Sequence, residues 1–350
     1  MKFNKLFVKI IMVSLLLFAV GCSKSKETTE NNTQSDSQYN GNLTVIGFSQ
    51  LGAESDWRSA NTQSMKETFT EENGYRLIFE DGQQKQANQI MAIRKFIQQG
   101  VDYIVLAPVT ETGWDTVLME AKDAGIPVII VDRMVDVSDD SLYECWVGSD
   151  FELEGKKVCQ WINDYAKKKH INPSKLKFVD LQGNIGATAQ IGRTRGLADS
   201  AREFGWTVLE YVPADFTQTK GREVMTALLK KHDDINVVYC ENDNEALGAI
   251  EALEAAGKKI GSDIRNGEIM VVSFDGVSDE ARMYVTQDKI SCIAECNPLH
   301  GPRVKGIIEK LEKGQEPPKL SYVSEEIYVH DNTVKNIRVD TIEYPVSVLD

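Results

Sequence analysis

Beyond residue 42, short apolar runs alternate with longer segments in which apolar residues recur at helical spacing. The apolar runs are rich in β-branched residues and are typical of buried strands in a parallel sheet. Leu247, Ile250 and Leu253 illustrate the helical spacing, because all three lie on one face of a helix. Strands are predicted at 43–48, 75–79, 101–106, 127–131, 177–181, 207–211, 237–239 and 269–274, and helices at 61–73, 86–99, 116–124, 189–204 and 244–256.

This alternation occurs twice along the chain. Asn73-Gly74-Tyr75 before one predicted strand has a counterpart in Phe204-Gly205-Trp206, and Asp132-Arg133 after another has one in Asp275-Gly276. A gene duplication and the general likeness of α/β domains both account for the pattern. The prediction is an α/β fold of two doubly wound, Rossmann-like lobes with a hinge and a ligand cleft between them.

The N-terminus has the features of an export signal. Lys2, Lys5 and Lys9 precede an apolar run over 10–20 that is too short to span a membrane and fits a signal peptide. The run ends at Ala19-Val20-Gly21-Cys22, which resembles a bacterial lipobox with Ala in place of the commoner Leu. We expect a lipoprotein signal peptide over 1–21, lipidation of Cys22 and a flexible polar tether over 22–41; the alternative is an ordinary secretory signal.

Charge and cysteine content exclude several classes of function. The 350-residue chain carries a net charge of −14, which argues against binding to nucleic acid. Five cysteines remain after Cys22, none in a CxxC pair, and there are four histidines, so neither a metal site nor a cofactor is expected. These cysteines are expected to be buried, although one disulfide that the sequence does not identify remains possible.

Polar side chains gather where the predicted strands end, which is where ligands bind in open α/β sheets. Carboxylate, amide and guanidinium groups beside an aromatic ring suit a neutral polyol, because each hydroxyl both donates and accepts hydrogen bonds. Two interpretations stay open here: Asp243 could cap the following helix, and Arg195 could be a solvated neighbour of Arg193. The strand-end residues are Ser49, Gln50, Asp81, Pro108, Asp132, Arg133, Gln182, Asp215, Phe216, Asn242, Asp243 and Asp275.

From about Leu43 to Val329 the chain resembles the type I periplasmic sugar-binding proteins of ABC transporters, and within them the galactofuranose-binding branch. The segments that carry the resemblance are GFSQLGAESDWR (47–58), DGQQKQ (81–86), APVTETGWD (107–115), GNIGA (183–187), DFT (215–217), KGREVM (220–225), ND (242–243) and ALGAI (246–250). The resemblance implies that Trp57 and Phe216 enclose a sugar ring. The other ligand-binding residues that it implies are Ser49, Glu54, Arg58, Asp132, Arg133, Arg193, Asn242, Asp275 and Glu295.

The resemblance also implies a function and a domain arrangement. The first lobe is expected to comprise 42–147 and about 297–322, and the second 148–296 and about 323–350. The expected protein is a monomeric, extracytoplasmic lipoprotein, anchored to the membrane through its N-terminal lipid. It would close around a galactofuranose-like monosaccharide, or a related pentose or hexose, and deliver it to the transmembrane subunits of an ABC permease.

Three other functions were considered. A sensor subunit that presents sugar to a histidine kinase or chemoreceptor would have the same fold and cleft, so it stays open. A transcriptional repressor of this fold would need a DNA-binding domain where the export signal lies. An enzyme is not expected, because the sequence has no G-x-S-x-G motif, P-loop, G-x-G-x-x-G motif or metal-ligand cluster.

Overall fold

The computed structural model describes residues 43–349. The predicted signal peptide, the lipidation site Cys22 and the tether lie outside this range. Among residues 43–349, no helix combines the length and apolar character that a membrane span requires.

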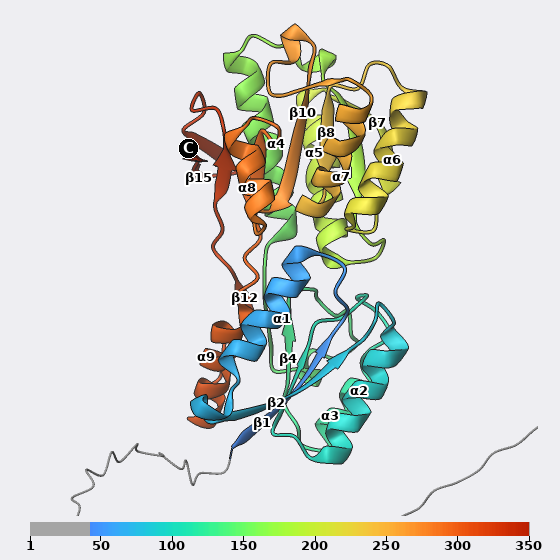
Figure 1. Cartoon of the computed structure of the whole chain (residues 1–350). Helices are drawn as coiled ribbons and strands as arrows, with labels where there is room; N and C mark the ends of the chain where they lie inside the picture. Colours follow the sequence, from blue (N-terminus) through green and yellow to red (C-terminus); the bar gives the residue numbers. More distant parts are fainter. Residues whose placement is uncertain (1–42, 350) are drawn as a thin grey trace, which may run out of the picture. The chain divides into compact units, whose positions relative to one another are not determined.

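The first lobe is built on a six-stranded parallel sheet with the order β12-β5-β4-β3-β1-β2 (Figure 1). Its helices α2 and α3 lie on one face, while α1 and α9 pack together on the other. The elements are β1 (Thr44–Gln50), α1 (Asp56–Thr68), β2 (Tyr75–Asp81), α2 (Gln86–Gln99), β3 (Tyr103–Leu106), α3 (Asp115–Asp123), β4 (Val128–Val131), β5 (Cys145–Gly148), α9 (His300–Glu312) and β12 (Leu320–Tyr322).

The second lobe contains the sheet β16-β13-β11-β10-β8-β6-β7, with β9 paired to β10. Helices α4 and α5 pack together on one face, and α6 and α7 on the other. The elements are α4 (Phe151–Lys168), β6 (Lys177–Gln182), α5 (Thr188–Phe204), β7 (Thr207–Pro213), α6 (Gln218–Lys231), β8 (Val237–Cys240), α7 (Asp243–Ala255), β9 (Lys259–Ile260), β10 (Glu268–Asp275), α8 (Asp279–Thr286), β11 (Cys292–Glu295), β13 (Ile327–Val329), the hairpin β14 (Asn336–Val339) and β15 (Ile342–Pro345), and β16 (Ser347–Val348).

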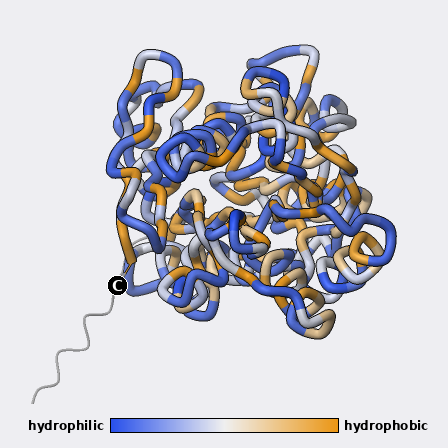
Figure 2. Tube along the Cα trace, turned by 90° about the horizontal axis from the view of Figure 1, so that it is seen from above, coloured by the Kyte–Doolittle hydropathy of each residue, from blue (hydrophilic) through white to orange (hydrophobic). Residues whose placement is uncertain are grey.

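The central strands are apolar at nearly every position because both of their faces are covered. On β8, Val237 and Tyr239 belong to the core beneath α4 and α5, whereas Val238 and Cys240 belong to the core beneath α6 and α7. Successive side chains of a strand point to opposite faces, so a strand between two helical layers needs apolar residues at both. Over the trace as a whole, which includes the helices and loops, hydrophobic and hydrophilic residues are intermixed (Figure 2).

Three connecting segments join the two sheets. The first, 149–150, follows β5 and leads into α4; the second, 296–299, follows β11 and leads into α9; the third, 323–326, joins β12 to β13. The α/β fold with two Rossmann-like lobes is thereby confirmed.

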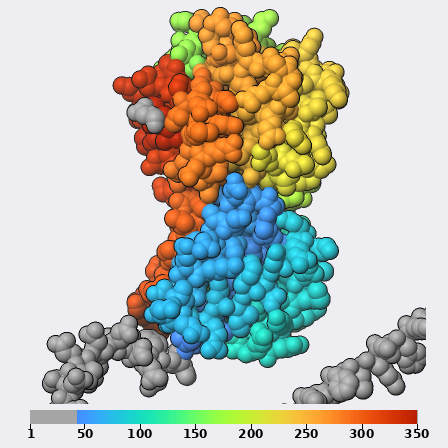
Figure 3. Space-filling model, in the orientation of Figure 1, coloured from blue at the N-terminus to red at the C-terminus, as the bar shows by residue number. Residues whose placement is uncertain are grey.

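The lobes also contact each other directly. The backbone N–H of Asp56 donates to Asn244 Oδ1 at 3.0 Å, and that of Met134 donates to Thr188 Oγ1 at 2.9 Å. In Figure 3 the blue surface of the first lobe meets the yellow and orange surface of the second. The two lobes therefore enclose the space between the carboxyl ends of their strands.

Candidate ligand-binding site

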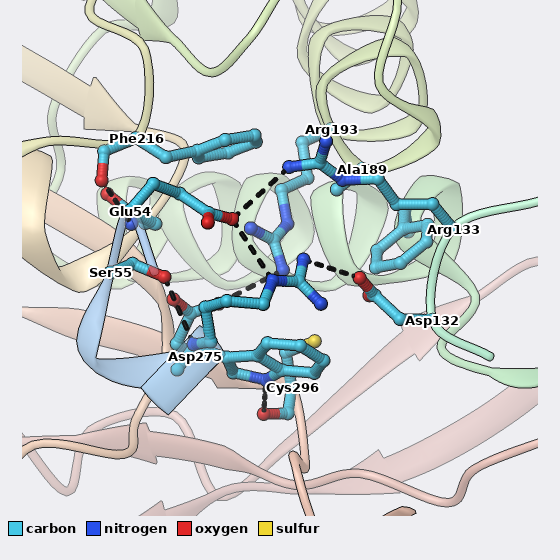
Figure 4. Close-up of a pocket in the computed structure, with 13 residues that line it drawn as sticks. Glu54, Ser55, Asp132, Arg133, Ala189, Arg193, Phe216, Asp275 and Cys296 are labelled. Carbon is cyan, nitrogen blue, oxygen red and sulfur yellow. Dashed lines mark hydrogen bonds and ion pairs between the residues drawn. The ribbon is translucent and has the colours of Figure 1, made fainter. Parts of the chain in front are cut away.

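A cavity with about 300 Å³ of empty volume, open solvent included, lies between the lobes. Side chains from both lobes converge on it (Figure 4). The lining residues are Glu54, Ser55, Trp57, Arg58, Asp132, Arg133, Phe151, Ala189, Arg193, Phe216, Asn242, Asp275 and Cys296.

The first turn of α1 brings two of these residues to the cavity. Ser55 caps the helix by accepting a hydrogen bond from the backbone N–H of Arg58 at 3.2 Å, so α1 starts at Asp56 instead of the predicted residue 61. A serine cap of this kind contributes about 1 kcal/mol. Trp57, in that turn, donates from Nε1 to the carbonyl oxygen of Cys296 at 2.7 Å. The cap therefore fixes the helix end that presents Trp57 and Arg58.

On the first-lobe side, charged groups form a buried network. Arg58 binds Asp132 through Nη2 at 2.6 Å and Glu54 through Nε at 3.1 Å. Arg133 lies 3.5 Å from the same Glu54 oxygen. Burial alone would raise the pKa of Asp132, but Arg58 and Arg133 hold it below its ordinary value. Burial, together with Arg58, lowers the pKa of Arg133 to about 10, so Asp132 and Arg133 are both charged near neutral pH.

Some donors of this network have no protein partner. Arg58 Nη1 and Arg133 Nε are buried and donate to no protein atom. A buried donor left without an acceptor costs roughly 1–3 kcal/mol. A ligand that offers hydroxyl oxygens to these atoms would recover that free energy.

A single arginine organises the second-lobe side. Arg193 binds Glu154 through Nε at 2.8 Å and Asp275 through Nη2 at 3.3 Å, and its Nη1 donates to the carbonyl oxygen of Glu241. Burial raises the pKa of Asp275 to about 6, with Arg193 acting in the opposite direction. The ionised Arg193–Asp275 pair therefore predominates above that pH.

Phe216 supplies an aromatic ring from the second lobe. Its φ of 59° lies in the left-handed region, which is unusual for a bulky residue. Its N–H donates to Glu245 Oε1 at 2.8 Å, and its carbonyl oxygen accepts from Asn242 Nδ2 at 3.1 Å. The Arg133 guanidinium carbon lies 5.6 Å from the ring centroid. Strain of this type is kept where surrounding contacts fix it, and here it aims the ring into the cavity.

Asn242 has a second contact, which corrects one interpretation of the sequence. Its side chain accepts from the Glu245 N–H at 2.8 Å, so Asn242 caps α7. Asp243 was considered for this cap, but it lies inside α7 and accepts hydrogen bonds from Ser273 and Val277.

Nine of the eleven predicted ligand-binding residues line the cavity. The two that do not are Ser49 and Glu295. Ser49 is fully buried within β1, which extends to Gln50 instead of ending at residue 48. Glu295 is the last residue of β11 and accepts hydrogen bonds from Asn297 Nδ2 and from the backbone N–H of Glu326. Its carboxylate thus holds two connecting segments together.

Four lining residues were not predicted: Ser55, Phe151, Ala189 and Cys296. Phe151 is the first residue of α4, a helix that the sequence analysis did not identify. Its ring centroid lies 5.5 Å from the Arg193 guanidinium carbon. The signal that could have revealed it is Asp150, which caps α4 by accepting from the Leu153 N–H at 3.0 Å.

Two further questions left open by the sequence have answers in the structure. The side chain of Arg195 is 60% exposed and pairs with Glu152, so Arg193 alone of this pair reaches the cavity. The five cysteines among residues 43–349 are all buried and free, without a disulfide. Burial raises the pKa of Cys145 to about 11 and that of Cys159 to about 12.

Comparison with known proteins identifies the family. Residues 46–300 match the model of the periplasmic binding protein domain. The galactofuranose-binding protein YtfQ of Escherichia coli (strain K12) is 38% identical over 297 residues, which cover 84% of this chain and 90% of YtfQ. The chain belongs to the type I periplasmic sugar-binding proteins.

Solved structures of related sugar-binding proteins agree with this assignment. A protein from Mycobacterium smegmatis in complex with β-D-fucofuranose is 41% identical, with a TM-score of 0.76 and coverage of 82% of this chain and 91% of that one. The periplasmic binding protein component of the arabinose ABC transporter from Shewanella sp. ANA-3, bound to α- and β-L-arabinofuranose, is 38% identical, with a TM-score of 0.75 and coverage of 82% and 92%. This sugar-binding family is extracytoplasmic and serves ABC importers.

Proposed function

We propose that the protein binds a neutral monosaccharide in its furanose form, of the galactofuranose and arabinofuranose type, in the cavity between the lobes. The observation that carries the proposal is the balance of charge around the cavity. Three guanidinium groups (Arg58, Arg133 and Arg193) face three carboxylates (Glu54, Asp132 and Asp275). This even balance favours an uncharged ligand over a sugar acid or a sugar phosphate.

The same groups suit hydroxyls. Each sugar hydroxyl can accept from a guanidinium and donate to a carboxylate, and charge-assisted hydrogen bonds contribute roughly 1.5–3 kcal/mol each. The rings of Trp57 and Phe216 offer apolar surface to the carbon face of a sugar. A few such bonds together with stacking are enough for micromolar affinity, about −8 kcal/mol.

The choice of a furanose rests on the relatives. YtfQ is named for galactofuranose, and the Mycobacterium and Shewanella structures contain β-D-fucofuranose and L-arabinofuranose. All three share 38–41% identity with this chain.

Thermal unfolding with a panel of sugars tests the proposal. D-Galactose, D-fucose and L-arabinose, which equilibrate between ring forms, are expected to raise the melting temperature. A ligand present at 100 times its Kd stabilises the folded state by about 2.7 kcal/mol. The matched control is methyl α-D-galactopyranoside, whose ring cannot open, and it is expected to give no shift.

Two results would contradict the proposal. Equal stabilisation by the locked pyranoside would show that the furanose form is not required. Absence of a shift with every pentose and hexose would show that the cavity does not take a free monosaccharide.

The proposal includes anchoring and delivery. Cys22 would carry the lipid that holds the domain at the outer face of the cell membrane, and the closed, sugar-bound form would dock on the ABC permease. The lipobox-like sequence and the ABC-transporter relatives support this part. Substituting serine for Cys22 is expected to release the protein from the membrane fraction, and retention of this variant in that fraction would contradict lipidation.

A further inference from the structure

The three connecting segments meet at a buried side chain, Glu325. Its Oε1 accepts from Ser149 Oγ in the first segment at 2.6 Å and from the backbone N–H of Asn297 in the second at 2.7 Å. Glu325 itself lies in the third segment. The carboxyl group of Glu325 therefore links the three segments that connect the lobes.

A second carboxyl group faces it. Side-chain ligand atoms of Glu154, Cys296 and Glu325 all lie within 4.8 Å of one another. Glu154 is 2% exposed; its Oε2 accepts from Arg193 Nε at 2.8 Å, while its Oε1 is buried and has no hydrogen-bond donor. Ser149 Oγ also lies 3.3 Å from Cys296 Sγ. We call Ser149, Glu154, Cys296 and Glu325 the hinge cluster.

The charges around the hinge cluster do not neutralise two carboxylates. Arg193 on α5 forms ion pairs with both Glu154 and Asp275 on β10, so its single charge is shared between two carboxylates. Lys157 on α4 donates from Nζ to the main-chain oxygen of Glu325 at 2.9 Å and not to its carboxylate. Asp275 on β10 and Arg303 on α9 also act on members of the cluster. Asp150 at the start of α4 and Glu295 on β11 act on Lys157.

We propose that Glu154 and Glu325 share one proton, so that the hinge cluster is a proton-binding site that links the sugar cavity to the hinge. A proton on Oε1 of Glu154 would let this oxygen donate a hydrogen bond to the Glu325 carboxylate. The chain of contacts then runs from the cavity through Arg193 and Glu154 to Glu325, and from there to all three connecting segments. This inference rests on the proposed sugar binding only for its effect on affinity.

The pKa directions agree with a shared proton. Burial raises the pKa of Glu154 well above its ordinary value, with Arg193 opposing and Glu325 adding to the rise. Burial also raises the pKa of Glu325, although hydrogen bonds from Ser149 and Asn297 and the charge of Arg193 oppose it. Groups with raised pKa values stabilise the form that holds the proton, and this contribution is lost as the pH rises through the folded-state pKa.

The consequence is an affinity that depends on pH. Rotation about the connecting segments on opening would separate the two carboxyls, so the closed form holds the proton more tightly than the open form. Between the pKa of the cluster in the open form and its higher pKa in the closed form, sugar affinity is expected to fall by up to about tenfold per pH unit as the pH rises. Asp275, whose pKa burial raises to about 6, would act in the same direction at lower pH, so the measurement belongs above pH 7, where Asp275 is ionised.

Infrared difference spectroscopy without sugar tests the proton directly. The wild type at pH 7 is expected to show a carbonyl band of a protonated carboxylic acid that disappears in both Glu154→Gln and Glu325→Gln. In each variant the amide of the new glutamine can donate a hydrogen bond in place of the shared proton, so the remaining carboxyl group stays ionised. Asp180, Glu241, Asp243 and Glu245 are buried carboxyls with raised pKa values, but they contribute equally to all three proteins and cancel in the difference.

Calorimetry with the tightest sugar of the panel, in buffers of different ionisation enthalpy, tests the link to binding. At pH values above 7 at which the sugar-free protein has lost its acid band, the wild type is expected to take up as much as one proton on binding, and Glu154→Gln to bind with a lower uptake and a flatter pH profile. Glu326→Gln is the matched control, because this neighbouring carboxyl is exposed and outside the cluster. It is expected to keep the wild-type profile.

Three outcomes would overturn the inference. An acid band that persists in Glu325→Gln would show that burial alone protonates Glu154. A wild type without the band, but with a bound divalent cation that Glu154→Gln loses, would assign the cluster to a metal. Equal proton uptake in wild type and Glu154→Gln would show that the proton of the cluster is not coupled to sugar binding. A failed sugar panel would leave the infrared result unaffected, so the two proposals fail independently.

Discussion

Replacement of Arg193 by alanine is expected to abolish detectable sugar binding and to lower the free energy of unfolding by about 3–5 kcal/mol. The side chain is 2% exposed and pairs with both Glu154 and Asp275. Its removal leaves two buried acids without their cation and the Glu241 carbonyl oxygen without its donor. Denaturant unfolding measures the stability change, and titration calorimetry measures the binding.

Arg195→Ala is the control for this substitution. Arg195 lies on the same helix, two residues further on, but its side chain is exposed and its pair with Glu152 is at the surface. Such surface changes alter stability by less than about 0.5 kcal/mol. Full sugar affinity in a folded Arg193→Ala protein would exclude Arg193 from the binding site.

Substitution of Gly183 by alanine is expected to weaken sugar binding by about 10- to 100-fold, because overpacking costs roughly 1–3 kcal/mol. A methyl group at this position would lie 1.9 Å from Cζ of Phe216. The Phe216 backbone is fixed on both sides by Glu245 and Asn242, so the ring itself has to move. Calorimetric titration of the variant, with circular dichroism to verify the fold, measures the effect.

A double substitution shows whether the ring carries the effect. In a Phe216→Ala background, Gly183→Ala is expected to cost little further affinity, since the clash no longer exists. Additive losses in the double variant would mean that Gly183 acts through a different contact. Unchanged affinity in Gly183→Ala alone would show that the ring position does not matter.

The sequence predicted the sheet-end chemistry of the site better than its helices. Asp132 and Asp275 directly follow or end buried strands, and parallel strands deliver such residues to one edge of a sheet. Both have positive φ, which Asp tolerates, so the turn and the functional group coincide. The apolar pattern of strands between two helical layers is strong, and it fixed the fold class without ambiguity.

The positions of the two predicted residues that do not line the cavity, Ser49 and Glu295, have a common physical origin in the period of a strand. A boundary error of one or two residues exchanges the side chain that faces the cavity for its neighbour, which points elsewhere. Ser49 was expected at the end of β1, but the strand continues to Gln50 and encloses it. Glu295 was expected in the site, and the next residue, Cys296, lines the cavity. Periodicity alone cannot settle a register of one residue.

The place of β12 in the first sheet has a consequence for folding. β12 pairs with β5, and α9 packs on α1, yet both come from the far end of the sequence. Until α9 has been synthesised, α1 lacks the helix on which it packs, and until β12 has been synthesised, one edge of β5 is unpaired. Such long-range pairings fold slowly and expose strand edges to aggregation. The lobe that emerges first from the ribosome thus stays incomplete until almost the whole chain has been made, and a chain truncated before β12 would leave β5 as an unpaired edge of the first sheet.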